Sequence, residues 1–252
     1  GVEVTYLGVD ENGLISLDEL KSSIQENTVL ISVQFANNEI GTIQDVESIG
    51  GICKDNNIPF MCDATQAIGK LEVDVEKLNI DLLCLSSHKI NGPKGVGSLY
   101  KRKRIKINPL LHGGGQEGGL RAGTLNTAGI VGFGKACEIA KNDLKKNHQK
   151  LSDIQTEFET FIESNKKGKV IAKSVSRLPH ISNIILNEDA ESFMIRNKDK
   201  ICVSTGSACN SSIVTQSHVL KGIGMTEQDS KRCVRFSFST NLTNFLKDIK
   251  FN

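Results

Sequence analysis

The sequence has no tryptophan, two tyrosines and four prolines in 252 residues, and its opposite charges nearly cancel. The 31 basic and 29 acidic side chains leave a formal net charge of +2, which argues against charge-driven binding of nucleic acid. No apolar run approaches the roughly 20 residues that span a bilayer, and residues 1–8 lack the basic and apolar regions of a signal peptide. We therefore expect a soluble protein with no direct nucleic-acid partner and no membrane partner.

Seven cysteines are too few for the disulfide framework of a small secreted protein, and the odd number leaves at least one thiol unpaired. This usage predicts a reducing compartment, either the cytoplasm or a compartment such as the mitochondrial matrix. No Cys-x-x-Cys pair occurs and the histidines show no paired ligand spacing, so the sequence predicts no metal site. Because the chain begins at Gly1 rather than at a methionine, we expect it to be part of something longer.

Strand and helix signals alternate through the first half of the chain. Short, mainly apolar runs predict strands at 2–7, 28–36, 59–63, 81–86 and 97–101. Ser16 begins a capping box before a helix that runs to about Ile24. Asp45 caps a helix to about Lys54, and a short polar helix is expected over 75–78. This rhythm predicts an α/β fold with a mainly parallel sheet.

The pattern changes in the second half of the chain. From residue 124 a long helical pattern continues towards Ile162. Short strands are then expected at 181–186, 201–204 and 234–238, separated by helices near 191–196 and 217–222. We place a domain boundary inside the long helix, which gives a larger domain over 1–143 and a smaller α+β domain over 144–252.

Two chemically useful side chains follow neighbouring strands of the predicted sheet. Asp63 ends the strand at 59–63, and Lys89 comes just past the strand at 81–86. Taken alone, Asp63 is equally well explained as a helix cap, and a lysine at a strand end is usually a solvated surface residue. Because ligands of parallel α/β sheets bind at the carboxyl ends of strands, both side chains are expected to face one crevice. A Schiff-base lysine beside a carboxylate is the arrangement that a pyridoxal phosphate site needs.

Seven motifs in a fixed order resemble those of the cysteine desulfurases of the NifS-like class. The motifs are Asn37-Asn38-Glu39-Ile40-Gly41, Asp63-Ala64-Thr65-Gln66, Ser86-Ser87-His88-Lys89 with Gly92-Pro93-Lys94-Gly95, His112-Gly113-Gly114-Gly115-Gln116-Glu117, Arg121-Ala122-Gly123-Thr124, Ser207-Ala208-Cys209 and Arg235-Phe236-Ser237. The resemblance spans almost the whole chain and implies a class V aminotransferase fold, which is fold type I of the pyridoxal-phosphate-dependent enzymes. It also implies removal of sulfur from L-cysteine, giving L-alanine and a protein-bound persulfide for a sulfur-acceptor protein.

The resemblance implies a catalytic role for two residues and a cofactor role for two more. Lys89 would be the Schiff-base lysine and the proton carrier at the substrate α-carbon, and Cys209 would be the nucleophile that takes the sulfur. Asp63 would keep the nitrogen of the pyridoxal ring protonated, so that the ring acts as an electron sink. Gln66 would hydrogen-bond the ring hydroxyl.

The remaining implied roles concern the cofactor phosphate and the substrate carboxylate. Ser86 and His88 would hold the phosphate, and Thr124 would reach the phosphate of the partner subunit across the interface of a homodimer. Asn38 would lie at the cofactor and, with Arg235, would hold the substrate carboxylate. Arginine suits this task because its planar fork binds a carboxylate through two hydrogen bonds.

Cys209 lies in a run of small and polar residues, 206–212, which has no core-forming periodicity and is typical of an exposed loop. The other six cysteines lie in strand or helix contexts, and we expect them to be small buried hydrophobes. They are Cys53, Cys62, Cys84, Cys137, Cys202 and Cys233. A dinucleotide site is disfavoured, because the glycine run 92–97 precedes a strand whereas that fingerprint must open a helix.

Alternative functions and acceptors stay open. A selenocysteine lyase, or another class V lyase or transaminase, would share the cofactor residues, although a transaminase needs no thiol at position 209. An inert fragment would act only as an interaction or dimerisation module. This is favoured by the absence of the family's N-terminal phosphate loop and ring-stacking residue, and Gly118 stands where the family usually has arginine. The acceptor could belong to iron–sulfur cluster assembly, tRNA thiolation or DNA sulfur modification.

Overall fold

The computed structural model describes residues 1–205, 216–242 and 245–251. The chain divides into two compact units. We call residues 26–35 and 45–144 the parallel-sheet unit, and residues 1–25, 36–44 and 145–252 the antiparallel-sheet unit. The division after residue 144 lies next to the boundary that the sequence predicts, but two N-terminal segments belong with the C-terminal half.

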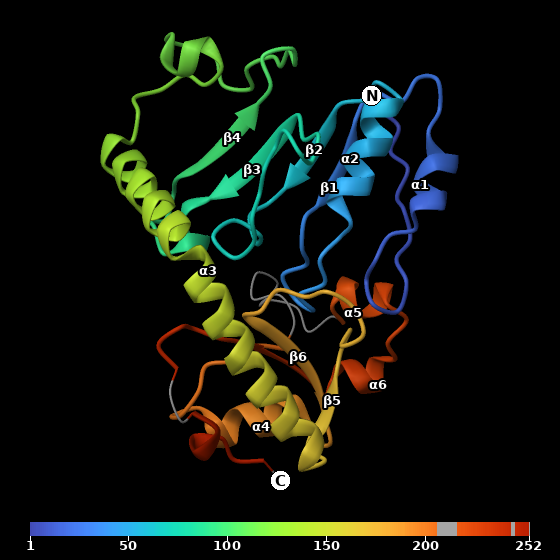
Figure 1. The fold of residues 1–252 in the computed structure, drawn as a ribbon, viewed down its shortest axis with the longest axis vertical. Coiled ribbons are helices and arrows are strands. Elements are labelled where there is room, and N and C mark those ends of the chain that lie inside the picture. The colour runs from blue at the N-terminus through green and yellow to red at the C-terminus, as the bar shows by residue number, and fades with distance from the viewer. Residues whose placement is uncertain (206–215, 243–244, 252) are drawn as a thin grey trace. The chain divides into compact units, whose positions relative to one another are not determined.

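A four-stranded sheet forms the framework of the parallel-sheet unit (Figure 1). Its strands lie in the order β1 (Ile31–Gln34), β2 (Phe60–Asp63), β3 (Leu82–Ser86) and β4 (Gly97–Lys101). The first three strands are parallel, and β4 returns antiparallel to β3. The α/β fold with a mainly parallel sheet is therefore confirmed for this unit.

The two faces of this sheet differ in polarity. Phe60, Cys62 and Leu83 are buried on one face. On the other face Asp63 lies level with Cys84, and side chains two residues apart on a strand share a face, so Asp63 and Ser86 point to the same side. Asp63 is exposed and Ser86 is half-buried, which leaves a polar face at the carboxyl ends of β2 and β3.

The helices of this unit begin where the sequence provides a cap. Asp45 accepts a hydrogen bond from Ser48 N at 3.0 Å and starts α2 (Val46–Asp55), whose residues Ile49, Ile52 and Cys53 are buried. The long helix α3 (Thr127–Ser164) has its first part in this unit, where Phe133 packs in one buried cluster with Ile90. Within the described residues, no helix combines the length and the apolar character that a membrane span requires.

A second sheet, of three antiparallel strands, forms the antiparallel-sheet unit. Its order is β5 (Gly168–Val170), β6 (Ile181–Leu186) and β7 (Cys233–Ser237). Helices α1 (Leu17–Ser23), α4 (Ala190–Asn197), α5 (His218–Gly222) and α6 (Glu227–Ser230) belong to the same unit. Its core contains four buried phenylalanine rings, and the ring centroids of Phe158 and Phe236 lie 4.5 Å apart.

A buried ion pair joins α3 to the segment before β6. Both terminal nitrogens of Arg177 donate to the Glu159 carboxylate at 2.8 Å, and Ser182 Oγ donates to the same group at 2.5 Å. Both charged side chains are less than a tenth exposed. A buried pair of this kind is costly to break, because removing one partner leaves the other charge uncompensated.

Three predicted elements are wrong and one strand was missed. Residues 2–7 form no strand, because no strand among the described residues pairs with them. Residues 75–78 form a turn, in which the Asp74 carboxylate accepts from the backbone of Glu76 and closes the chain locally. Residues 201–204 make a single bridge at Ser204, whereas β5 forms in a segment for which the sequence predicts no strand.

Candidate active site

Four of the predicted cofactor residues lie at the carboxyl ends of β2 and β3. Asp63 is the last residue of β2, and Ser86 is the last residue of β3. The strand β3 leads directly into a single 3-10 turn, η1 (Ser87–Ile90), which carries His88 and Lys89. Because β2 and β3 are neighbouring parallel strands, this edge of the sheet gathers a carboxylate, a hydroxyl, an imidazole and an amine.

The η1 turn exposes its polar side chains and is closed by the glycine that follows. Ser86 Oγ and His88 Nδ1 are joined by a hydrogen bond of 2.8 Å, and both His88 and Lys89 are exposed. Asn91 takes a left-handed conformation with φ of 62°, and Gly92 N donates to Ser87 O at 3.0 Å. A Cβ atom at Gly92 would lie 2.2 Å from Ser87 Oγ, so the turn requires glycine there.

Asp63 begins a second turn beside η1. Its Oδ1 accepts a hydrogen bond from Thr65 N at 2.9 Å, which orients the carboxylate at the end of the strand. Gln66 follows in this turn and is half-buried. Burial raises the pKa of the Cys84 thiol, and the nearby Asp63 carboxylate raises it further. The pKa of Cys62 is raised to about 12, again by burial first and then by Asp63.

Thr124 ends a glycine-rich loop of the same unit and is exposed. The preceding η2 turn (Gln116–Gly119) and its neighbours use positive φ angles repeatedly, as at Gly118 (64°) and Gly123 (108°). Gln116 Oε1 accepts from Gly123 N at 3.1 Å and holds the loop together. These backbone conformations explain the glycine content of the loop.

The two predicted carboxylate-binding residues are brought together in the antiparallel-sheet unit. Arg235 lies on β7, and its Nη1 donates to the backbone oxygen of Asn38 at 3.0 Å. The turn that carries Asn38 is closed by Asn37, whose Oδ1 accepts from the backbone N–H groups of Glu39 and Ile40. Asn38 is half-buried, so this polar pair is accessible in part.

Cys209 lies outside the described residues, in the segment 206–215. Residues on each side of this segment form hydrogen bonds to the rest of the antiparallel-sheet unit. Ser204 exchanges backbone hydrogen bonds with Arg235, the shorter of which is 2.8 Å. Beyond the segment, Ser217 caps α5 and its Oγ donates to the buried Glu39 carboxylate at 2.5 Å. Both anchors therefore involve the turn and the strand that carry Asn38 and Arg235.

The expectation that the other cysteines are buried is confirmed for Cys53, Cys62 and Cys233. Cys84 and Cys137 are only half-buried, and Cys202 is exposed, so the expectation is wrong for Cys202. Cys202 does not belong to a strand, because only Ser204 of that segment pairs with β7. An exposed thiol therefore lies in the stretch that precedes Cys209.

The donor set at the sheet edge fits pyridoxal phosphate. Asp63 offers a carboxylate for a protonated ring nitrogen, and Lys89 offers an exposed amine for an aldehyde. The Ser86 hydroxyl and the His88 imidazole, already joined by a hydrogen bond, offer donors for a phosphate. The four groups come from one edge of one sheet, so they can act on one ligand.

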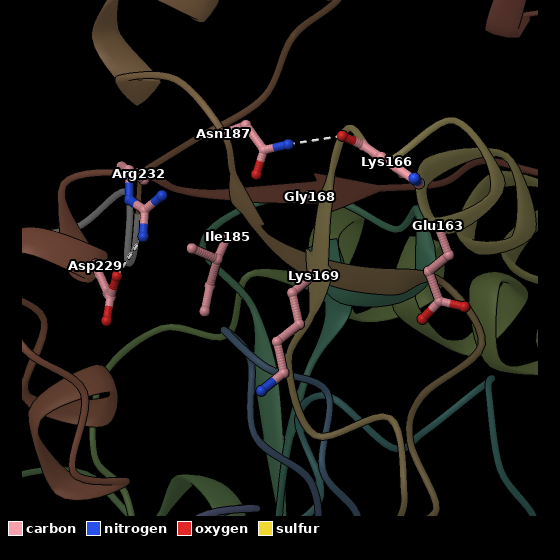
Figure 2. A pocket seen from close by; sticks show the side chains of 8 residues that line it. All are labelled: Glu163, Lys166, Gly168, Lys169, Ile185, Asn187, Asp229 and Arg232. Atoms are coloured by element: carbon pink, nitrogen blue, oxygen red, sulfur yellow. Dashed lines mark hydrogen bonds and ion pairs between the residues drawn. The ribbon is translucent and has the colours of Figure 1, made fainter.

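A hollow of about 540 Å³ lies elsewhere, in the antiparallel-sheet unit (Figure 2). It is lined by Glu163, Lys166, Gly168, Lys169, Ile185, Asn187, Asp229 and Arg232. Figure 2 shows the side-chain amide of Asn187 directed at the backbone oxygen of Lys166, and Arg232 paired with Asp229. Of the predicted site residues that the structure describes, none lines this hollow.

A protein-family model matches nearly the whole length of the chain. The aminotransferase class-V model matches residues 1–249. The chain belongs to the aminotransferase class-V family. Among curated relatives, the chain is 46% identical over 239 residues to "Cysteine desulfurase IscS" of Methanosarcina thermophila. This match covers 94% of the chain and 59% of the relative, so the chain spans well under two thirds of the relative's length.

Two solved structures are similar to this chain in fold. The structure of a "NIFS-LIKE PROTEIN" is 36% identical with a TM-score of 0.89, and the match covers 99% of this chain and 67% of the other. The structure of "SspA in complex with cysteine" is 39% identical with a TM-score of 0.80, covering 94% and 67%. The expected class V fold, fold type I of the pyridoxal phosphate enzymes, is thus confirmed.

Proposed function

We propose that this protein is a cysteine desulfurase that uses pyridoxal phosphate to move the sulfur of L-cysteine onto Cys209, with L-alanine as the other product. The observation that carries the proposal is the meeting of Asp63 with Ser86, His88 and Lys89 at the carboxyl ends of two neighbouring parallel strands. Relatives named cysteine desulfurase and the complex of SspA with cysteine support L-cysteine as the substrate.

Each residue has a defined task in this reaction. Asn38 and Arg235 bind the substrate carboxylate, and Gln66 binds the hydroxyl of the cofactor ring. Ser86 and His88 hold the phosphate, while Asp63 keeps the ring nitrogen protonated. Bound in this way, the cofactor supplies an electron sink for charge that develops at the substrate α-carbon.

Lys89 and Cys209 then divide the chemistry between them. Lys89 moves the proton at the α-carbon, and the Cys209 thiolate attacks the substrate sulfur. The carbon–sulfur bond of the substrate breaks and a sulfur–sulfur bond forms, so the balance is one L-cysteine and one protein thiol giving one L-alanine and one protein persulfide. The persulfide passes to an acceptor protein of iron–sulfur assembly, tRNA thiolation or DNA sulfur modification.

The proposal includes a homodimer in a reducing compartment, either the cytoplasm or the mitochondrial matrix. Thr124 reaches the cofactor phosphate of the partner subunit, a role supported by its exposure at the end of the glycine-rich loop. The functional domains are the cofactor domain over 1–143 and the domain with the cysteine loop over 144–252. A selenocysteine lyase or another class V enzyme is the alternative within enzymes, and an inert dimerisation module is the alternative outside them.

The experiment compares two cysteines that lie close together in the sequence, Cys202 and Cys209. Protein loaded with pyridoxal phosphate is incubated with L-cysteine, alanine is quantified, and persulfide is mapped by alkylation and mass spectrometry. Cys209→Ser is expected to lose alanine release and the persulfide together. Cys202→Ser is the matched control and is expected to keep both, because Cys202 is exposed but has no task in the reaction.

Two other outcomes would replace the proposal. Undiminished alanine release by Cys209→Ser would favour a class V lyase, in which no protein thiol takes the sulfur. Failure of the parent protein to take up pyridoxal phosphate would favour the inert module.

A further inference from the structure

Lys70 lies in the turn that begins at Asp63 and has no task in the proposed reaction. Backbone hydrogen bonds fold this segment tightly: Ala67 N and Ile68 N donate to Ala64 O, and Lys70 N donates to Ala67 O, all within 3.0 Å. Asp63, Gln66 and Lys70 are therefore carried by one short, ordered stretch of chain. Any movement of this stretch therefore moves the Asp63 carboxylate and Lys70 together.

The same turn packs directly against η1. Gly69 has φ of +70°, and a Cβ atom there would lie 2.8 Å from Ile90 Cγ2 and 3.2 Å from Ala140 Cβ. The absence of a side chain thus lets the backbone at residue 69 approach the η1 turn and the side of α3. This close approach places the next residue, Lys70, beside Lys89.

Lys70 makes a hydrogen bond to the backbone of the proposed cofactor lysine. Its Nζ donates to the backbone oxygen of Lys89 at 3.1 Å. The pKa of Lys70 is lowered, mainly by burial and also by the positive charge of Lys89. The bond fixes the main chain at Lys89, and the Lys89 side chain itself is left exposed.

We propose that Lys70 is a positioning residue that fixes the Lys89 turn relative to Asp63 and Gln66. The Lys89 amine, the Asp63 carboxylate and the Gln66 amide can then contact one pyridoxal ring. The inference rests on the proposed function for its consequence, but its structural part concerns only Lys70 and η1. An ordered site lowers the cost of binding, because less freedom is lost when the ligand arrives. Loss of Lys70 should therefore weaken cofactor uptake without a change in any group that touches the cofactor.

The test uses three variants of one protein. Lys70→Met keeps most of the side-chain volume but removes the donor, and Lys70→Arg restores a cationic donor. Lys101→Met is the matched control: Lys101 lies in the same unit and its Nζ also donates to backbone oxygens, those of Ile105 at 2.8 Å and Arg102 at 3.3 Å. Lys101 pairs with Leu82 at the start of β3, so it lies at the opposite end of the strand from Ser86.

The first readout is amide hydrogen exchange of the peptide 86–92 in protein without cofactor. Lys70→Met should speed exchange in this peptide about tenfold, because a hydrogen bond from a charged donor that held the turn closed is lost. Lys101→Met and Lys70→Arg should leave its exchange unchanged within about threefold. Equal exchange in Lys70→Met and Lys101→Met would overturn the proposal.

The second readout is the apparent affinity for pyridoxal phosphate, measured by absorbance titration. Lys70→Met should bind about tenfold more weakly than the parent, and Lys70→Arg should recover most of this loss. Equal weakening by Lys101→Met would also overturn the proposal, because it would point to general destabilisation. If the parent takes up no cofactor, the proposed function fails, and the exchange comparison alone decides the role of Lys70.

Discussion

Replacement of Gly92 by alanine should destabilise the turn that carries Lys89. The new Cβ atom would lie 2.2 Å from Ser87 Oγ, 3.0 Å from Ala136 Cβ and 3.1 Å from Ser87 O, so atoms must shift by about 1 Å to restore van der Waals contact. Ser87 and Ala136, which lies on α3, are both buried, so neither side chain can move into solvent. Overpacking of this kind costs about 1–3 kcal/mol. For a chain of this size, that cost lowers Tm by about 2–12 °C.

A double-mutant cycle with Ser87 makes this prediction specific. Among the described residues Ser87 Oγ has no hydrogen-bond partner, so Ser87→Ala alone should cost little or stabilise the protein. The same change removes the closest atom that the Gly92→Ala methyl meets, so the double variant should recover much of the lost stability. Thermal unfolding measures all four proteins, and Gly134→Ala is the control because its Cβ meets nothing within 4 Å. Strict additivity of Ser87→Ala and Gly92→Ala would refute the steric argument.

Two further predictions follow from burial. Alkylation at pH 8 followed by peptide mapping should label Cys202 quickly, whereas Cys53, Cys62 and Cys233 should react only after unfolding. Burial raises the pKa of each of these three thiols to about 12 and blocks access of the reagent. Labelling of Cys62 in the native protein at the rate of Cys202 would contradict this prediction. Glu159→Gln should cost about 3–5 kcal/mol and lower Tm by at least about 6 °C, because Arg177 is left buried without its counter-charge. Glu138→Gln breaks an exposed pair with Lys135 and should leave Tm nearly unchanged, so similar losses in the two variants would be inconsistent with this account.

The parts of the fold that local chemistry determines could be predicted from the sequence. Ser16 and Asp45 cap α1 and α2 as expected, because a cap needs only a side-chain oxygen and the backbone N–H groups of the next turn. The strand predicted at 2–7 failed, because apolar alternation does not provide the neighbouring strand that pairing requires. The strand β5 was missed because its three residues form a strand only through their pairing with β6, which the local sequence does not show.

The candidate site likewise has residues that could be predicted from the sequence and residues that could not. Asp63 and Lys89 could be placed at one sheet edge, because the carboxyl ends of parallel strands meet there, whereas Ser86 and His88 followed only from the family resemblance. Lys70 could not be found, because a long side chain that donates to a distant backbone oxygen leaves no spacing pattern in the sequence. The exposure of Cys202 was missed because an apolar context predicts burial only where the segment joins the sheet.

The most direct test of the central claim is to find the residue that carries the cofactor. Protein incubated with pyridoxal phosphate is reduced with borohydride, digested, and analysed for the peptide that bears the pyridoxal group. The account predicts that Lys89 carries the label, that Lys89→Ala loses it and that Lys94→Ala keeps it. Lys89 lies in η1 directly after β3 and offers an exposed amine at the sheet edge where Asp63 ends β2. A label on Lys94 or Lys70 in the parent protein, or a label that survives in Lys89→Ala, would contradict the account.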